Sequence, residues 1–260
     1  MKSLIERQGG TAILAPSMRE IPLEQNAAAL AFGDRLRVGA VDVMVFLTGV
    51  GARALAEVLA LHMTLPQLVE ALRECVVVVR GPKPAAVLRE WGARIDVQVP
   101  EPNTWRELLD AIARHSPIEG KVVAVQEYGI PNADLYQGLQ HLGGTVLPVP
   151  VYRWELPEDT GPLRAAVRAI VAGELDVLLF TSAQQWRHLE QIAREEGEAE
   201  TFLSAAQRCV IASIGPTASE TLLAAGLSPD IEPPHPKMGH LVLAVAEQAR
   251  DLVRSKREPA

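Results

Sequence analysis

Small and hydroxyl-bearing residues follow several apolar runs of this chain, in positions where they could bind an anion. Thr48-Gly49-Val50-Gly51 and Thr181-Ser182-Ala183 follow two such runs, and Gly81-Pro82-Lys83 and Gly215-Pro216-Thr217 follow two others. If each group opens a helix, its backbone N–H groups and the positive end of the helix dipole attract a negative ligand. The structural alternative makes Thr and Ser simple N-caps and Gly a turn residue. Four such groups favour a shared anion-binding cleft, with candidate residues Thr48, Gly49, Gly81, Lys83, Thr181, Ser182, Gly215 and Thr217.

Tyr152 is the candidate for chemistry. It ends the stretch "GGTVLPVPVY" at 143–152. An oriented tyrosine hydroxyl can donate a proton in a reaction. The alternative is a half-buried tyrosine whose hydroxyl meets a backbone carbonyl. A further strand end, Gln126-Glu127-Tyr128-Gly129, belongs with the groups that could bind an anion.

The sequence lacks the motifs that are typical of several enzyme classes. It contains no GxGxxG, Walker loop, GxSxG or HExxH, and its six histidines lack a metal-binding spacing, so we expect no metal and no cofactor. The net charge of −7 and the lack of a Lys/Arg run argue against nucleic acid as a partner. No apolar run approaches the roughly 20 residues of a membrane span, and no signal core opens the chain, so we expect a cytoplasmic protein. Cys75 and Cys209 are predicted to be buried, reduced thiols.

The chain repeats itself at one fixed offset, which makes position 143 equivalent to position 9. "GGTAILAPSM" at 9–18 falls on "GGTVLPVPVY" at 143–152, and "VDVMVFLTG" at 41–49 falls on "LDVLLFTSA" at 175–183. "CVVVVRGPK" at 75–83 falls on "CVIASIGPT" at 209–217. The register runs without a gap from about position 9 to position 100, so the sequence predicts two equivalent halves.

Each half alternates strands with helices, which predicts open parallel α/β sheets. Continuous apolar runs, typical of strands buried on both faces, are followed by amphipathic segments. Gly92 and Gly226 are well placed to end helices. The predicted strands are 41–47, 75–79, 121–129, 175–181 and 209–214, and the predicted helices are 52–59, 85–91, 134–142, 184–193 and 218–225.

One strand has no counterpart in the first repeat. The strand at 121–129 precedes the second glycine pair, and subtracting the repeat offset from its first residues gives positions below 1. We therefore expect the first strand of the first repeat to be missing. We also expect reduced stability in the domain that lacks it.

Several segments, taken in order, are similar to the uroporphyrinogen-III synthase family. They are "GGTAILAPSMREIPL", "DVMVFLTGVGARAL", "VAVQEYG" with "GLQHLGGTVLPVPVYRW", "DVLLFTSAQQW" and "IASIGPTASETLLAAGLSPDI" with "HLVLAVAE". The resemblance covers nearly the whole chain, and its most specific segment is the Ile-Gly-x-Thr-Ala turn followed by Ala-Gly-Leu-x-Pro-Asp. The chain departs from the family in lacking the usual first strand and its arginine.

The resemblance implies two flavodoxin-like α/β domains joined by a two-stranded connector. One domain combines residues 1–20 with 154–260, and the other is continuous over 24–150. The repeat places the connector strands near 19–25 and 150–159. Such a protein is expected to be a monomer.

The resemblance also implies a reaction, the cyclisation of hydroxymethylbilane to uroporphyrinogen III with loss of water and inversion of ring D. This is a hydro-lyase reaction that needs no cofactor. Tyr152 matches the family tyrosine that assists loss of the hydroxyl, and the candidate residues of the anion-binding cleft match the family's substrate loops. Two alternatives remain open, a two-lobed protein that binds an anionic ligand without chemistry and an inactive paralogue.

Overall fold

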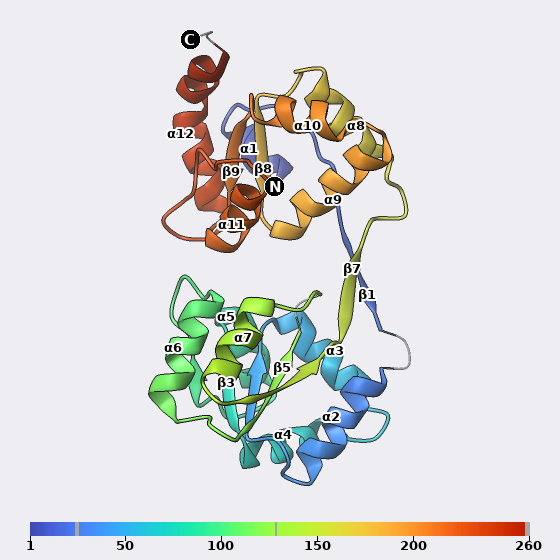
Figure 1. The fold of residues 1–260 in the computed structure, drawn as a ribbon, viewed down its shortest axis with the longest axis vertical. Helices are drawn as coiled ribbons and strands as arrows, with labels where there is room; N and C mark the ends of the chain where they lie inside the picture. Colours follow the sequence, from blue (N-terminus) through green and yellow to red (C-terminus); the bar gives the residue numbers. More distant parts are fainter. Residues whose placement is uncertain (24–25, 128, 258–260) are drawn as a thin grey trace. The chain divides into compact units, whose positions relative to one another are not determined.

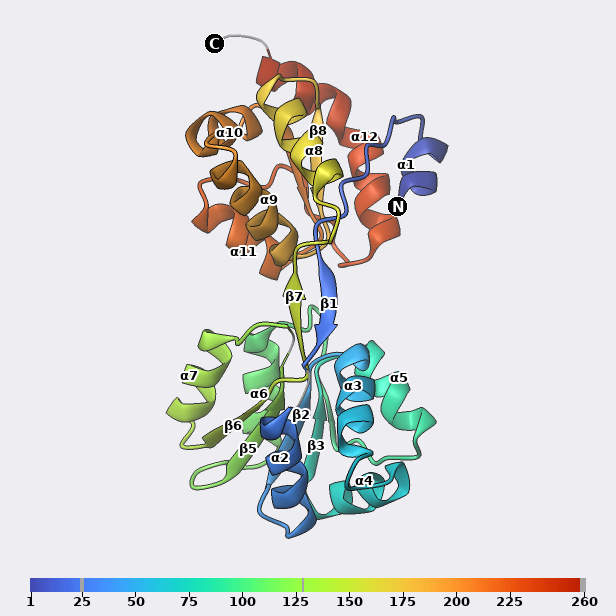
Figure 2. The same cartoon turned by 90° about the vertical axis from the view of Figure 1, so that its right-hand side faces the viewer.

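A computed structural model describes residues 1–23, 26–127 and 129–257 of the chain. Glu24 and Gln25 of the predicted connector, Tyr128 of the predicted strand end and residues 258–260 of the predicted split domain lie outside the described residues. The chain divides into two compact units. Unit 1 is Met1–Arg19 with Glu155–Ala260, and unit 2 is Glu20–Trp154. The chain passes between the units in β1 (Arg19–Pro22) and β7 (Tyr152–Glu155), which pair as a two-stranded sheet (Figure 2).

Unit 2 is built on a parallel five-stranded sheet with the order β4-β3-β2-β5-β6. Strands β3 and β5 of this sheet are labelled in Figure 1. Its strands are β2 (Val43–Phe46), β3 (Val76–Val79), β4 (Val97–Gln98), β5 (Val122–Gln126) and β6 (Thr145–Val149). Its helices are α2 (Ala27–Arg37), α3 (Gly49–Leu59), α4 (Leu65–Ala71), α5 (Pro82–Glu90), α6 (Trp105–His115) and α7 (Ala133–His141), with a short 3-10 turn at Leu72–Glu74.

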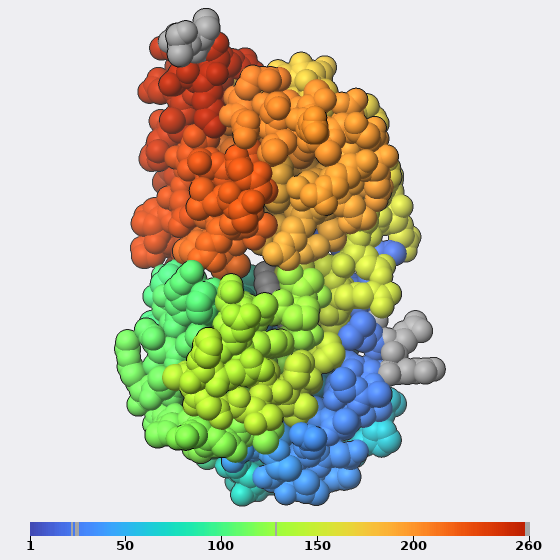
Figure 3. Space-filling view, in the orientation of Figure 1, coloured from blue at the N-terminus to red at the C-terminus, as the bar shows by residue number. Residues whose placement is uncertain are grey.

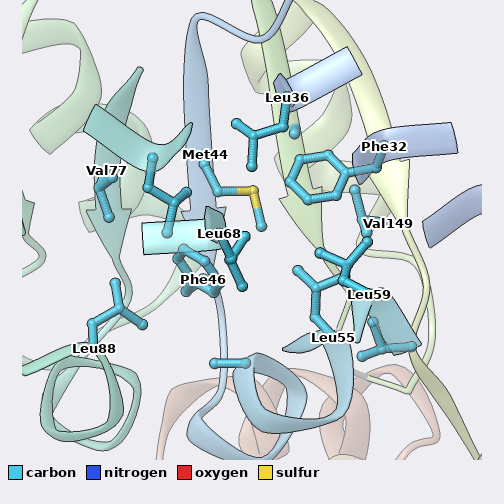
Figure 4. Packing of buried hydrophobic residues seen from close by; sticks show 14 of the residues in the cluster. Phe32, Leu36, Met44, Phe46, Leu55, Leu59, Leu68, Val77, Leu88 and Val149 are labelled. Atoms are coloured by element: carbon cyan, nitrogen blue, oxygen red, sulfur yellow. The ribbon is translucent and has the colours of Figure 1, made fainter. Parts of the chain in front are cut away.

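The central strand β2 is buried on both faces, as its continuous apolar sequence predicts. Met44 and Phe46 point into one core, where Phe32 of α2 and Leu55 of α3 pack against them (Figure 4). Val43 and Val45 belong to the core on the opposite face of the sheet. Helices therefore cover both faces of the sheet, and in sheets of this kind ligands bind outside the carboxyl ends of the strands.

Unit 1 has a smaller sheet. Strand β8 (Val177–Phe180) pairs in parallel with β9 (Val210–Ser213), and a single bridge joins Ala212 to Ile231. Its helices are α1 (Lys2–Arg7), α8 (Gly161–Val171), α9 (Ala183–Glu195), α10 (Ala199–Ala206), α11 (Pro216–Ala224) and α12 (Met238–Arg257). Helix α12, red in Figure 3, is the last helix of this unit, and it packs on β9.

The internal repeat is visible in the hydrogen bonds of both sheets. Val43 is paired with Val76 in unit 2, and their repeat equivalents, Val177 and Val210, are paired in unit 1. The carboxylate of Asp96 accepts a hydrogen bond from the Val77 amide at 2.8 Å, and that of Asp230 accepts one from Ile211 at 2.7 Å. Both partners of the second bond are again the repeat equivalents of the first, so the two halves share a local architecture as well as a sequence pattern.

The predicted helices form, with boundaries that differ from the prediction by a few residues. The helix predicted from Ala52 begins at Gly49, directly after Thr48. The helices predicted from 85 and 218 begin at Pro82 and Pro216, where proline's fixed φ suits the first turn. Gly92 and Gly226 follow the ends of their helices with φ of 71° and 81°, which confirms their predicted role as C-terminal glycines.

The first glycine stretch does not form the strand that its repeat partner forms. Residues 143–152 contain β6, whereas residues 11–18 have no regular structure, and Ile13 and Leu14 are 62% and 51% exposed. Strand β6 is held by β5, and unit 1 has no described strand in the place of β5. Without that neighbour, the main chain of residues 11–15 has no ladder to join.

The same difference appears at the repeated aspartates that open β2 and β8. The carboxylate of Asp42 accepts a hydrogen bond from the β5 amide of Val122 at 2.7 Å. Asp176 instead forms an ion pair with Arg257 of α12 at 2.6 Å. The described part of unit 1 therefore adapts locally to a sheet of fewer strands.

Cys75 and Cys209 are buried free thiols, as predicted from the sequence. Burial raises the pKa of the Cys75 thiol to about 12. None of the described helices is long and apolar enough to cross a membrane.

Candidate active site

The turn between β2 and α3 places Thr48 at the carboxyl end of the central strand of unit 2. Thr48 is the N-cap of α3, and its hydroxyl oxygen accepts a hydrogen bond from the Gly51 amide at 2.9 Å. The backbone amide of Thr48 donates to the side-chain oxygen of Gln126 at 3.1 Å. The hydroxyl and the backbone amide of Thr48 are therefore both fixed by the surrounding chain.

Tyr152 meets this turn through its hydroxyl group. The residue begins β7, is only 4% exposed, and its ring belongs to the core that contains Phe46 and Trp154. Its hydroxyl oxygen lies 3.3 Å from the Thr48 hydroxyl oxygen, and either group can be the donor. Two residues that the sequence presented as separate candidates thus form one hydroxyl pair.

Gly49 allows the β2–α3 turn to approach the first turn of α5. A Cβ atom at Gly49 would lie 2.9 Å from the backbone oxygen of Lys83, closer than real Cβ contacts allow. A Cβ at Gly81 would overlap the side-chain oxygen of Asn103. Gly49 is therefore required by the close approach of the Lys83 backbone, and it brings the Thr48 and Lys83 turns together at one edge of the sheet, whereas a Cβ at Gly81 would require the Asn103 side chain to move.

The N-terminus of α5 has no side-chain cap. Its N-cap is Gly81, and its first three residues are Pro82, Lys83 and Pro84. Because proline has no N–H, Lys83 supplies the only backbone donor among these three residues, and its ammonium group adds a full positive charge. Lys83 is exposed. At this helix end, the predicted backbone donors of the first three residues are therefore reduced to the single amide of Lys83.

In unit 1, the turn at Thr181 and Ser182 differs from the expectation of free backbone amides. The amides of Thr181 and Ser182 both donate to the side-chain oxygen of Gln185, at 2.6 and 3.1 Å. The Ser182 hydroxyl oxygen accepts from the Gln184 amide at 3.3 Å, completing a capping box within α9. The prediction of free amide donors was wrong here and at Thr48, because glutamine side chains occupy these donors.

The remaining candidates, Gly215 and Thr217, lie at the start of α11. Gly215 is the N-cap of this helix and provides no side-chain cap, and Pro216 follows it. Thr217 is exposed. This end is equivalent to that of α5 by the repeat, with Thr217 in the position of Lys83.

Glu127 is the only buried acidic residue within the described ranges, and it follows β5 directly. The Tyr136 hydroxyl donates to its carboxylate at 2.7 Å. Burial is the main cause that raises the pKa of the Tyr136 hydroxyl, and the hydrogen bond to Glu127 is the second. Tyr136 is therefore held as a neutral donor to Glu127.

The structure brings Thr48, Gly49, Lys83 and Tyr152 to one edge of unit 2. It places Gly81 beside them, and Thr181, Ser182, Gly215 and Thr217 at the corresponding strand ends of unit 1. Sequence reasoning missed the part played by Gln126, although it noted the residue at a strand end. The signal was in the repeat, where Gly51 falls on Gln185.

Comparison with known proteins agrees with the resemblance in the sequence. The family model described as Uroporphyrinogen-III synthase HemD matches residues 1–243. The chain belongs to the uroporphyrinogen-III synthase family. A protein of Methanothermobacter thermautotrophicus named "Putative uroporphyrinogen-III synthase" is 32% identical over 216 residues, which are 82% of this chain and 79% of that protein.

Solved structures of uroporphyrinogen-III synthases share the fold. A crystal structure of a mutant uroporphyrinogen III synthase from Thermus thermophilus has a TM-score of 0.70 and 25% identity, covering 96% of this chain and 93% of that one. The wild-type protein of the same organism in another crystal form gives a TM-score of 0.56 and 26% identity, covering 97% and 94%. The mixed α/β fold with a parallel sheet is thus a property of this family.

Proposed function

We propose that this protein is a uroporphyrinogen-III synthase, which cyclises hydroxymethylbilane to uroporphyrinogen III with loss of water and inversion of ring D. In this proposal it is a hydro-lyase that works as a monomer in the cytoplasm without a metal or organic cofactor. The observation that carries the proposal is the hydroxyl pair of Tyr152 and Thr48 at the carboxyl end of a parallel sheet, in a chain of this family.

Tyr152 is proposed to start the reaction as a general acid. The hydroxyl of the ring A hydroxymethyl group leaves as water only when its oxygen gains a proton, and the tyrosine hydroxyl supplies that proton as the C–O bond breaks. An azafulvene cation remains, and attack by ring D leads through a spiro intermediate to the closed ring. The proton lost from carbon at closure balances the proton that Tyr152 gave, so the phenol is restored.

Thr48 is proposed to support Tyr152 during that transfer. Its oxygen already accepts the Gly51 amide, so its own hydrogen is available for the tyrosine oxygen 3.3 Å away. A hydrogen bond donated to the phenolate stabilises the charge that develops as the proton leaves.

Substrate binding is proposed to use the ends of α5 and α11. Hydroxymethylbilane carries many carboxylates, and a protein with a net charge of −7 does not attract it through bulk charge. Local donors are needed, and we propose that the Lys83 ammonium group and the backbone amides of Lys83 and Thr217, at the uncapped ends of α5 and α11, provide them. We further propose that units 1 and 2 are the two flavodoxin-like domains predicted from the sequence.

The test is the isomer composition of the product. Hydroxymethylbilane closes spontaneously to the type I isomer, so purified protein should raise the fraction of type III above a no-protein control. Chromatography of the oxidised porphyrins separates the isomers. A protein that binds hydroxymethylbilane and leaves the product entirely type I would instead be a binding protein or an inactive paralogue.

A further inference from the structure

Gln126 is an unusual residue for its position. It ends β5, a strand of valine and alanine, and its side chain is completely buried. A buried amide is stable only when its donor and acceptor groups are both satisfied. Here the side-chain oxygen accepts from the Thr48 amide at 3.1 Å, and the side-chain nitrogen donates to the backbone oxygen of Glu127.

The repeat shows that unit 1 caps the equivalent turn in a different way. Ser182 stands where unit 2 has Thr48, and Gln185 stands where unit 2 has Gly51. In unit 1 the amides of the turn donate to Gln185, a residue of the same helix. The cap of α9 is therefore local and independent of any neighbouring strand.

Unit 2 replaces that local cap with a side chain from the neighbouring strand β5. Gly51 has no side chain, and a Cβ there would overlap the amide of Gln126, lying only 2.7 Å from its oxygen. The glycine thus leaves the space that Gln126 fills. As a result, the turn that carries Thr48 is tied directly to β5.

Only unit 2 combines this arrangement with a phenol. The repeat places Met18 of unit 1 where unit 2 has Tyr152. The glutamine that accepts from the turn amide therefore comes from a neighbouring strand in the unit that has the hydroxyl pair of Thr48 and Tyr152. In unit 1, which lacks the pair, it comes from the same helix. If capping were its only purpose, the local glutamine of unit 1 would serve equally well.

We propose that Gln126 is a positioning residue, which holds the Thr48 amide so that the Thr48 hydroxyl stays directed at the Tyr152 hydroxyl. The inference rests on the proposed function, because its kinetic consequence is on the step that Tyr152 assists. That Gln126 holds the Thr48 amide in place can be tested without measuring activity. Gln126 touches the Thr48 turn and acts on the phenol only through it.

The kinetic test is a double-mutant cycle between Gln126→Met and Thr48→Val. Methionine keeps the length of the side chain and removes both hydrogen bonds, and valine removes only the threonine hydroxyl. We expect each single variant to lower kcat for type III formation about tenfold, because each weakens the hydrogen bond between the Thr48 and Tyr152 hydroxyls, whose loss at about 1.4 kcal/mol predicts that factor, with KM changed less than twofold. The double variant should fall no further than the single variants. Thr48→Ser, which keeps the hydroxyl, should retain most of the wild-type kcat.

Additive losses in the double variant would overturn the proposal, since Gln126 would then act by a route other than Thr48. A rise in KM with unchanged kcat would overturn it as well. A general loss of folding would lower activity in all variants, so the thermal unfolding temperature of each variant is measured alongside.

Amide hydrogen exchange of Thr48, measured by NMR without substrate, tests the geometry separately. Gln126→Met should speed this exchange at least about tenfold, while Thr48→Ser leaves it close to the wild type. Unchanged exchange in Gln126→Met would refute the positioning of Thr48 by Gln126, even if the enzyme is active. If the exchange is faster in Gln126→Met but the wild-type protein forms no type III isomer, the positioning of Thr48 by Gln126 is supported and the proposed function is refuted.

Discussion

Replacing Gly51 by alanine should destabilise unit 2, although alanine normally favours a helix. The new Cβ would overlap the Gln126 amide, so this side chain must leave its place. The Thr48 amide and the Glu127 carbonyl would then lose their partners. Each unsatisfied buried group costs about 1–3 kcal/mol, so the two together cost about 2–6 kcal/mol, and alanine returns at most about 1 kcal/mol. We expect a net loss of about 3 kcal/mol in the free energy of unfolding.

The assay is hydrogen exchange read by mass spectrometry under conditions where exchange reports the unfolding of each unit. Peptides from β2, β5 and α3 should lose protection in Gly51→Ala, and peptides from unit 1 should not. Gly239→Ala is the matched control, because Gly239 lies in α12, has nothing within 4 Å of an added Cβ and does not have a positive φ. This control should keep or slightly raise the stability of unit 1.

A second substitution separates steric conflict from other effects. In a Gln126→Ala background the space beside Gly51 is empty, so adding Gly51→Ala should cost less than about 1 kcal/mol. The coupling between the two sites should therefore be about 2 kcal/mol or more. If Gly51→Ala is as stable as the wild type, or equally costly in both backgrounds, the packing of Gln126 against Gly51 is refuted.

Two further predictions follow from the sheets and from the helix ends. Amides of β8 should exchange faster than those of β2 in the wild-type protein, because β2 pairs with two strands and β8 pairs only with β9 among the described residues; equal protection would show that the smaller sheet is not the weaker one. Lys83→Ala should raise KM for hydroxymethylbilane several-fold with little change in kcat, as expected for loss of one charge at a binding helix end. Lys2→Ala on α1 is the control for loss of a lysine, and an equal effect of both variants would remove Lys83 from the binding site.

The repeat made most of the architecture predictable. Its ungapped register placed β2 with β8, β3 with β9, and α5 with α11, and the structure preserves that register in the bonds of Asp96 and Asp230. Residues 11–18 were the exception. Their apolar residues, and the glycine pair just before them, match the stretch that contains β6, but a strand also needs a neighbour, which sequence similarity does not supply.

The site was only partly predictable, for a related reason. Thr48 and Tyr152 could be chosen by residue type, but their separation of 3.3 Å depends on the path of β7 across unit 2. The amides at Thr48, Thr181 and Ser182 were expected to be free, because the sequence does not show that glutamine side chains accept from them. For Thr48 that glutamine is 78 positions away in the chain. The pairing of Gly51 with Gln185 in the repeat was the available sign that unit 2 takes its acceptor from elsewhere.

The most direct test of the central claim is the rate of type III formation by Tyr152→Phe, compared with Tyr136→Phe. Both variants remove one phenol hydroxyl from unit 2, and the Tyr136 hydroxyl donates to Glu127 instead of pairing with Thr48. A positioned acid typically contributes a factor of 10²–10⁴, so Tyr152→Phe should lower the rate at least about tenfold while Tyr136→Phe stays close to the wild type. A Tyr152→Phe enzyme that forms the type III isomer at the wild-type rate would contradict the account.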